Sequence, residues 1–184
     1  MTWVDAIPIV LILVYALLGY ATGVLRRLIS LISLYVACFA ATNMVIQAGG
    51  ILQQSSSVST ADSRVFGFFG ILFAVIILID GAAQLANAQI QVQALVFNRA
   101  SGLIVGVLTG LLLSVIVVYE LQAAANPFGG AQLTPNEQGI RDAVNGSHFA
   151  VPLTRALEKP IIAIFQPVLP SDPQITFGPG PVNP

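Results

Sequence analysis

The chain has 184 residues, of which 56% are hydrophobic and 8% are charged, and its mean hydropathy is +0.87. A typical soluble domain carries about 25% charged residues, so the composition excludes an ordinary soluble domain and a disordered chain. Its 7 Lys and Arg against 8 Asp and Glu leave a net charge of -1, which argues against a basic stripe for nucleic acid. We therefore expect a membrane protein whose first partner is the lipid bilayer.

Four apolar runs are each long enough, at about 20 residues, to cross roughly 30 Å of hydrocarbon as helices. They span residues 6–25, 28–48, 65–86 and 101–121. Because the runs lack the alternating polarity of barrel strands, we predict an all-α membrane domain of four transmembrane helices over residues 1–122. The first run lacks the basic flank of a signal peptide, so we expect it to be retained.

A turn must separate the first two runs, because one helix over residues 6–48 would be about 65 Å long. Glycines loosen a helix most readily, which places the turn between Gly19 and Arg27. A short amphipathic piece over residues 24–31, lying in the membrane interface, stays open as an alternative.

Basic residues predict the orientation of the helices. Arg26 and Arg27 lie in the first connection and Arg99 in the third, whereas Asp5 precedes the first run. The positive-inside rule then makes both connections cytoplasmic and both termini extracytoplasmic. The third connection is itself a polar, almost uncharged run over residues 84–97, which extends the third helix or forms a half-buried loop.

Residues 123–184 form a proline-rich tail, expected to be extracytoplasmic with one or two short helices. Thr134, Pro135 and Glu137 form a capping box with proline in the first helical position, and Gly146 follows as a stop signal.

A second short helix is expected between residues 151 and 165, broken or kinked at Pro160. From Pro167 onward we expect an extended or disordered chain.

Glycine spacing gives the strongest packing signal. Close backbone approach replaces hydrophobic drive between helices in lipid, and glycine permits that approach. The pattern predicts packing of the first and fourth helices on one another, with a homo-oligomer interface as the alternative, through Gly19, Gly23, Gly102, Gly106 and Gly110.

Asp80 is the candidate functional residue, because a carboxylate inside a membrane run costs a few kcal/mol unless it is paired or hydrated. Three interpretations stay open. Asp80 lies at the interface, pairs with Arg26, Arg27 or Arg99, or handles ions or protons. We interpret the three arginines as residues that set the orientation of the helices in the membrane. The functional alternative is that they bind anionic lipid head groups.

The remaining residues give no catalytic or metal-binding pattern. Cys38 is the single cysteine and reads as a small core residue, and His148 lacks the partners of a triad. Glu120 reads as an interfacial charge beside Tyr119. We expect no enzyme activity, no metal and no cofactor.

Two stretches resemble the colicin V production protein family. One is Trp3-Val4-Asp5 and its apolar run, which ends in Gly19, Gly23 and Arg26. The other is Asn98-Arg99-Ala100-Ser101-Gly102, which leads into Gly106 and Gly110. The resemblance covers residues 3–122. It differs at Thr22, where members of the family often carry a basic residue, and in the long proline-rich tail.

The resemblance implies a bacterial inner-membrane protein connected with colicin V production, a toxin biosynthetic process, and with envelope homeostasis. Two hypotheses follow. The first is a non-enzymatic accessory or scaffold protein with a membrane protein partner. The second is a small oligomeric transporter or channel subunit that uses Asp80. Asn98, Arg26, Arg27 and Arg99 complete the candidate polar set.

Overall fold

The computed structural model describes residues 1–55, 58–86, 95–126 and 133–177, and every element in these ranges is a helix. The four long helices are α1 (Trp3–Thr22), α2 (Val24–Ser55), α3 (Thr60–Ala86) and α4 (Leu95–Ala125). Each contains an apolar stretch long enough to cross a membrane. The tail adds α5 (Pro135–Asn145), α6 (Ala150–Phe165) and α7 (Pro173–Thr176). The predicted all-α membrane architecture is confirmed.

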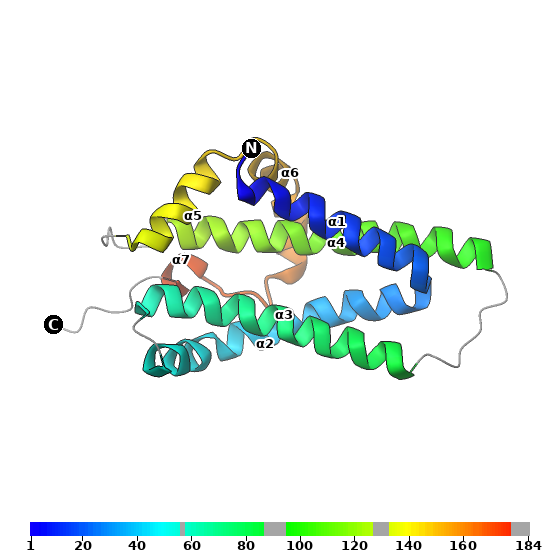
Figure 1. Ribbon diagram of the computed structural model, residues 1–184, viewed down its shortest axis with the longest axis horizontal. Coiled ribbons are helices and arrows are strands. Elements are labelled where there is room, and N and C mark those ends of the chain that lie inside the picture. The colour runs from blue at the N-terminus through cyan, green and yellow to red at the C-terminus, as the bar shows by residue number, and fades with distance from the viewer. Residues whose placement is uncertain (56–57, 87–94, 127–132, 178–184) are drawn as a thin grey trace.

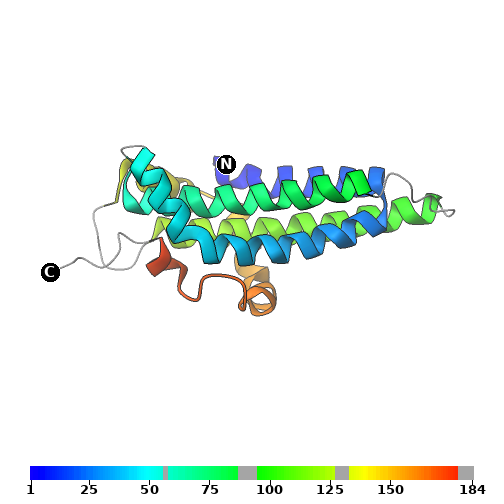
Figure 2. The same ribbon diagram turned by 90° about the horizontal axis from the view of Figure 1, so that it is seen from below.

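The long helices form two antiparallel pairs (Figure 1), with α1 along α4 and α2 along α3. Gly19 near the end of α1 faces Gly102 near the start of α4, and Gly49 near the end of α2 faces Arg64 near the start of α3. The two pairs are held together through α2 and α4. In Figure 2, α6 and α7 project from one side of this bundle.

The turn between α1 and α2 is a single residue, Gly23, which lies inside the predicted interval. Its φ of 82° is in the left-handed region that favours glycine. Since α2 is helical from Val24, the separate interfacial piece over residues 24–31 is wrong. Arg26 and Arg27 accordingly lie in the first turn of α2 rather than in a connection.

The long helices extend past most ends of the apolar runs. Polar residues continue a helix as readily as apolar ones, so an apolar run marks the buried or lipid-facing length and not the helix itself. Helix α3 reaches Ala86 and α4 begins at Leu95, so the polar run over residues 84–97 extends both helices. Its middle, residues 87–94, lies outside the described residues.

In the tail, the predicted capping box is confirmed. The Thr134 hydroxyl accepts from the Glu137 amide at 3.1 Å, and the Glu137 carboxylate accepts from the Thr134 amide at 2.6 Å. Helix α6 is also confirmed, but it runs unbroken through Pro160. A proline removes one amide donor, and the loss of that one bond has not ended the helix.

The expectation of an extended or disordered chain from Pro167 is wrong up to Phe177. Val168, Leu169 and Phe177 are buried, and the ring of Phe177 meets that of Phe68 edge-on with centroids 5.5 Å apart. Burial of these apolar side chains against the bundle supplies the order that the proline content did not predict. Residues 178–184 lie outside the described residues.

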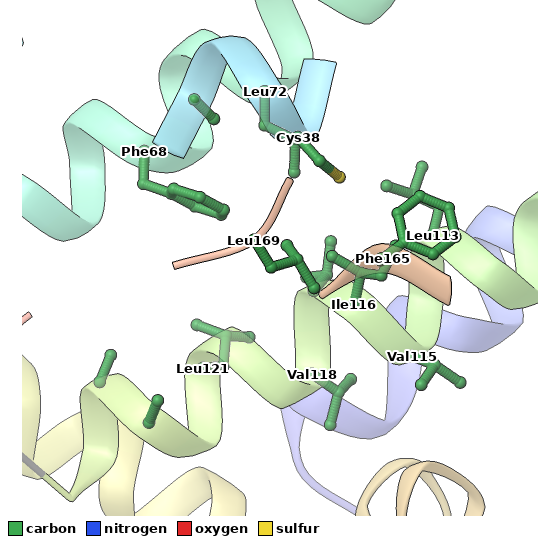
Figure 3. Packing of buried hydrophobic residues seen from close by; sticks show 14 of the residues in the cluster. Cys38, Phe68, Leu72, Leu113, Val115, Ile116, Val118, Leu121, Phe165 and Leu169 are labelled. Carbon is green, nitrogen blue, oxygen red and sulfur yellow. The ribbon is translucent and has the colours of Figure 1, made fainter. Parts of the chain in front are cut away.

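The hydrophobic core joins both helix pairs and the tail. Figure 3 shows Cys38 of α2 and Leu72 of α3 facing Leu113 and Ile116 of α4, with Phe165 and Leu169 of the tail between them. Cys38 is fully buried and free, which confirms its reading as a core residue.

Candidate functional site

Asp80 lies at the end of the bundle that carries the Gly23 turn, which we call the turn end. The hydroxyls of Ser30 and Ser33 on α2 donate to its two carboxylate oxygens at 3.1 and 3.0 Å. Serines four or three residues apart lie on one helix face, so α2 presents both hydroxyls to one carboxylate on α3. Each hydroxyl also lies within hydrogen-bond distance of an α2 carbonyl, Ser30 of Arg26 and Ser33 of Ser30, so its single proton is shared between that carbonyl and Asp80. This network joins α2 to α3.

Arg27 is buried beside this network, with only 2% of its surface exposed. Its guanidinium lies over the ring of Tyr15 on α1, 5.6 Å from the centroid, and interacts electrostatically with Asp80. Among the described residues, its Nε and Nη1 have no hydrogen-bond partner. For Arg27 the structure contradicts the alternative of a lipid head-group contact, because a side chain with 2% of its surface exposed does not reach a head group. We call Tyr15, Arg27, Ser30, Ser33 and Asp80 the turn-end cluster.

Asn98 connects the start of α4 to the turn between α1 and α2. Its side-chain oxygen accepts from the first amide of α2, at Val24, at 2.9 Å. A Cβ atom added at Gly23 would lie 2.2 Å from the Asn98 side chain, so the glycine is required for space as well as for its backbone angle. Arg99 lies next to this contact, with its guanidinium 5.8 Å from the ring centroid of Tyr20.

The glycines of α4 contact the backbone of α1 directly. A Cβ atom built on Gly102 would lie 2.3 Å from the carbonyl oxygen of Gly19, and one on Gly106 would lie 2.2 Å from that of Tyr15. Gly110 lies slightly further from the next turn of α1, where its Cβ would be 2.8 Å from the Cα of Ile12. The structure therefore places the glycine repeat inside one chain, between the first and fourth helices.

At the opposite end, which we call the tail end, Asp5 forms a site that sequence reasoning missed. It is fully buried and accepts from the amides of Phe149 and Ala150, both at 3.0 Å, and from the hydroxyl of Ser147. The Thr2 amide donates to its other oxygen at 3.0 Å. Because Phe149 at the N-cap of α6 has no side-chain acceptor, Asp5 of α1 supplies the missing cap.

A second acid attaches the tail to α3. Asp62 accepts from the Thr134 hydroxyl at 3.0 Å and from the Asn136 amide at 3.2 Å. Two residues further along α3, Arg64 donates to the backbone oxygen of Thr176 at 3.3 Å. The tail is thus bonded to both α1 and α3.

Glu120 corrects the expectation of an interfacial charge. It is fully buried in α4, and among the described residues neither carboxylate oxygen has a hydrogen-bond partner. Cys38 of α2 is close enough to interact with it electrostatically. The tail explains the difference, because α6 and α7 both pack on α4.

The acidic residues of the described part lie apart from one another. Within those residues, no three His, Cys, Asp or Glu side chains lie close enough to hold a metal ion. Asp5, Asp62 and Asp80 instead lie at separate places and each accepts hydrogen bonds from another helix or from the tail. The arrangement holds helices and tail in fixed positions.

No curated protein and no solved structure shows a significant similarity to the chain. A family model does match it. The model describes the colicin V production protein, and the match runs over residues 4–157, which includes the four long helices together with α5 and the first half of α6. The chain therefore belongs to the colicin V production protein family.

Proposed function

We propose that the chain is a non-enzymatic accessory or scaffold protein of the bacterial inner membrane, which supports colicin V export and envelope homeostasis through a protein partner. In this proposal it presents a rigid tail at the outer membrane surface. The family match supports the connection with colicin V production, and the four apolar helices support a multi-pass membrane protein.

The observation that carries the proposal is the use of two acids, the buried Asp5 and the half-buried Asp80, as internal anchors. Asp80 joins α2 to α3 through two serines, and Asp5 joins α1 to the start of α6. A carboxylate that accepts several hydrogen bonds inside a helix bundle is satisfied where it lies and stabilises one conformation. Such anchors suit a protein that holds a fixed surface for a partner.

The orientation is part of the proposal. Arg26, Arg27 and Arg99 all lie within a few residues of the turn end of the bundle, where the positive-inside rule counts them. The long tail weighs little in that rule, because long segments cross the membrane largely regardless of charge. We therefore place the turn end in the cytoplasm and both termini outside.

Purification from native membranes in a mild detergent tests the proposal. The native mass and the identity of every co-purifying protein are measured for the wild type and for Asp5→Ala, which removes the acceptor that fixes α6. We expect a heterologous partner at a constant ratio with the wild type, and less of it with Asp5→Ala. A homo-oligomer without any partner would contradict the proposal.

The buried Arg27 favours one alternative, a small transporter or channel subunit. Two of its nitrogens have no hydrogen-bond partner among the described residues, and Asp80 is nearby. Intramembrane charges of this kind mark ion or proton pathways in many membrane proteins. The alternative predicts that Asp80→Asn abolishes activity while membrane insertion stays normal. The accessory protein should tolerate the same change, because an asparagine keeps an oxygen for one serine.

A further inference from the structure

Helix α6 crosses the bundle instead of running along it (Figure 1). At its start, the amides of Phe149 and Ala150 donate to Asp5 in the first turn of α1. At its end, the ring of Phe165 contacts that of Tyr35 on α2, with centroids 5.6 Å apart. Between these two ends it packs on α4. Since the long helices span the membrane, a helix that crosses them lies close to the membrane plane.

The depth of α6 follows from the register of α1 and α4. The glycine contacts between these helices make Leu113 and Ile116 of α4 level with residues 5–8 of α1. Phe165 lies beside Leu113 and Ile116 (Figure 3). Helix α1 begins at Trp3, and its 20 residues match the thickness of the hydrocarbon. Both ends of α6 therefore lie within about 8 Å of the tail-end boundary of the hydrocarbon.

The surface of α6 divides into three stripes along the helix. One stripe is buried against the bundle and consists of Ala150, Thr154, Ile161 and Phe165. A second stripe is charged and consists of Arg155, Glu158 and Lys159. A third stripe is apolar and consists of Phe149, Leu153, Pro160 and Ile164. At about 100° per residue, the charged and apolar stripes lie on opposite flanks of the buried one.

The apolar stripe is largely uncovered. Phe149 and Ile164 keep 42% and 62% of their surfaces exposed, although each lies next to a residue that is buried in the bundle. In water, such a stripe on a helix that is otherwise well packed would leave apolar surface hydrated at both ends of α6. The exposure therefore calls for an apolar neighbour on this flank.

The charged stripe faces the tail end of the bundle. Glu158 interacts electrostatically with Tyr119 of α4, and both line a polar pocket together with Gln122 and Asn126. These three α4 residues lie nearer the tail end than Ile116, beside which α6 ends. Because the apolar stripe is on the opposite flank, it faces the turn end, along the membrane-spanning surface of the bundle.

We propose that α6 is an interfacial helix, inserted in the tail-end leaflet with its apolar stripe against the acyl chains. Arg155 and Lys159 then lie at the level of the head groups and water. Interfacial helices bury their apolar side about 5–10 Å into the boundary of head groups and acyl chains, which is the depth of α6. A flank that faces the bilayer centre at this depth meets hydrocarbon. The proposal is independent of the orientation of the bundle and of the proposed function.

Spin labels on the two flanks test the surroundings of α6. The full chain with Cys38→Ala carries one new cysteine at a time, Ile164→Cys or Phe149→Cys on the apolar stripe and Lys159→Cys or Arg155→Cys on the charged stripe. All four side chains are exposed, so a label does not displace the core. The chain is reconstituted in vesicles of phosphatidylethanolamine and phosphatidylglycerol in equal amounts. Collisions of the label are measured with oxygen, which concentrates in hydrocarbon, and with a nickel chelate, which stays in water.

We expect the ratio of oxygen to nickel collisions to be at least about tenfold higher for Ile164→Cys than for Lys159→Cys, because a polar chelate enters hydrocarbon poorly. Phe149→Cys and Arg155→Cys should differ in the same direction and provide an independent pair. Frequent nickel collisions on the apolar stripe would overturn the proposal, because the stripe would then face water. Rare collisions with both reagents there would also overturn it, because a second copy of the chain or another protein would then cover the stripe.

Discussion

Gly106→Ala is the sharpest test of the way in which α1 and α4 pack. The new Cβ atom would lie 2.2 Å from the carbonyl oxygen of Tyr15. Real Cβ atoms essentially never come closer than 3.0 Å to such a neighbour, which leaves a shortfall of 0.8 Å (3.0 minus 2.2). The obstacle is backbone rather than a flexible side chain, so the two helices must move apart.

The expected loss follows from two opposing effects. Overpacking costs about 1–3 kcal/mol, and an immovable backbone atom places this site at the upper end. Alanine returns up to about 1 kcal/mol through its higher helix propensity. We therefore expect Gly106→Ala to lower the free energy of unfolding by about 2 kcal/mol.

Gly70→Ala provides the matched control. Gly70 lies inside α3, and a Cβ atom there would meet nothing within 4 Å, so we expect no loss and a gain of up to about 1 kcal/mol. Both variants are unfolded in mixed micelles of a mild detergent and dodecyl sulfate, with the fluorescence of Trp3 as the signal. If Gly106→Ala is as stable as Gly70→Ala, the close packing of α1 and α4 is refuted.

Three further outcomes are expected. Gly23→Ala should cost about 1–2 kcal/mol from its left-handed backbone alone, besides its clash with Asn98, and thermal unfolding will measure the loss. Asn98→Ala should cost about 1 kcal/mol by removing the acceptor of the Val24 amide, whereas Asn98→Asp should not, and equal losses would refute the capping role. Asp5→Ala should speed hydrogen exchange at the Ala150 amide, and unchanged exchange would show that Asp5 does not cap α6.

Sequence reasoning reached the parts of the fold that depend on local chemistry. Apolar length predicted four membrane helices, and glycine spacing predicted the partner of the first helix. The same glycines placed the turn, which proved to be Gly23, the one residue in the described part of the chain with a left-handed backbone. Helix ends were less accurate, because hydropathy records which residues meet lipid and not where backbone hydrogen bonds stop.

The candidate site depends on contacts that are distant in sequence. Asp5 and Ala150 are 145 residues apart, and no local pattern connects them. Two features of the sequence pointed to this contact. Helix α6 begins at a phenylalanine, which cannot cap it, and Asp5 is the one charged residue of the first helix. Glu120 was misread for the same reason, because its burial depends on where the tail folds.

Asp80 shows what a sequence can and cannot supply. Its position inside an apolar run indicated that it needed partners, and arginines at the same end were the obvious candidates. The structure instead directs two serine hydroxyls to it, from positions that look unremarkable in the second run. The identity of the partners depended on which face α2 turns toward α3.

Production of colicin V by cells that carry only Asp80→Asn is the most direct measurement of the central claim. The cells lack their own family member, and the variant is compared with the wild-type chain at equal amounts in the membrane. The account predicts that production is retained, because asparagine preserves an acceptor for one of the two α2 serines and the scaffold stays intact. Loss of production with normal insertion and an unchanged fold would contradict it and favour a transporter that uses Asp80.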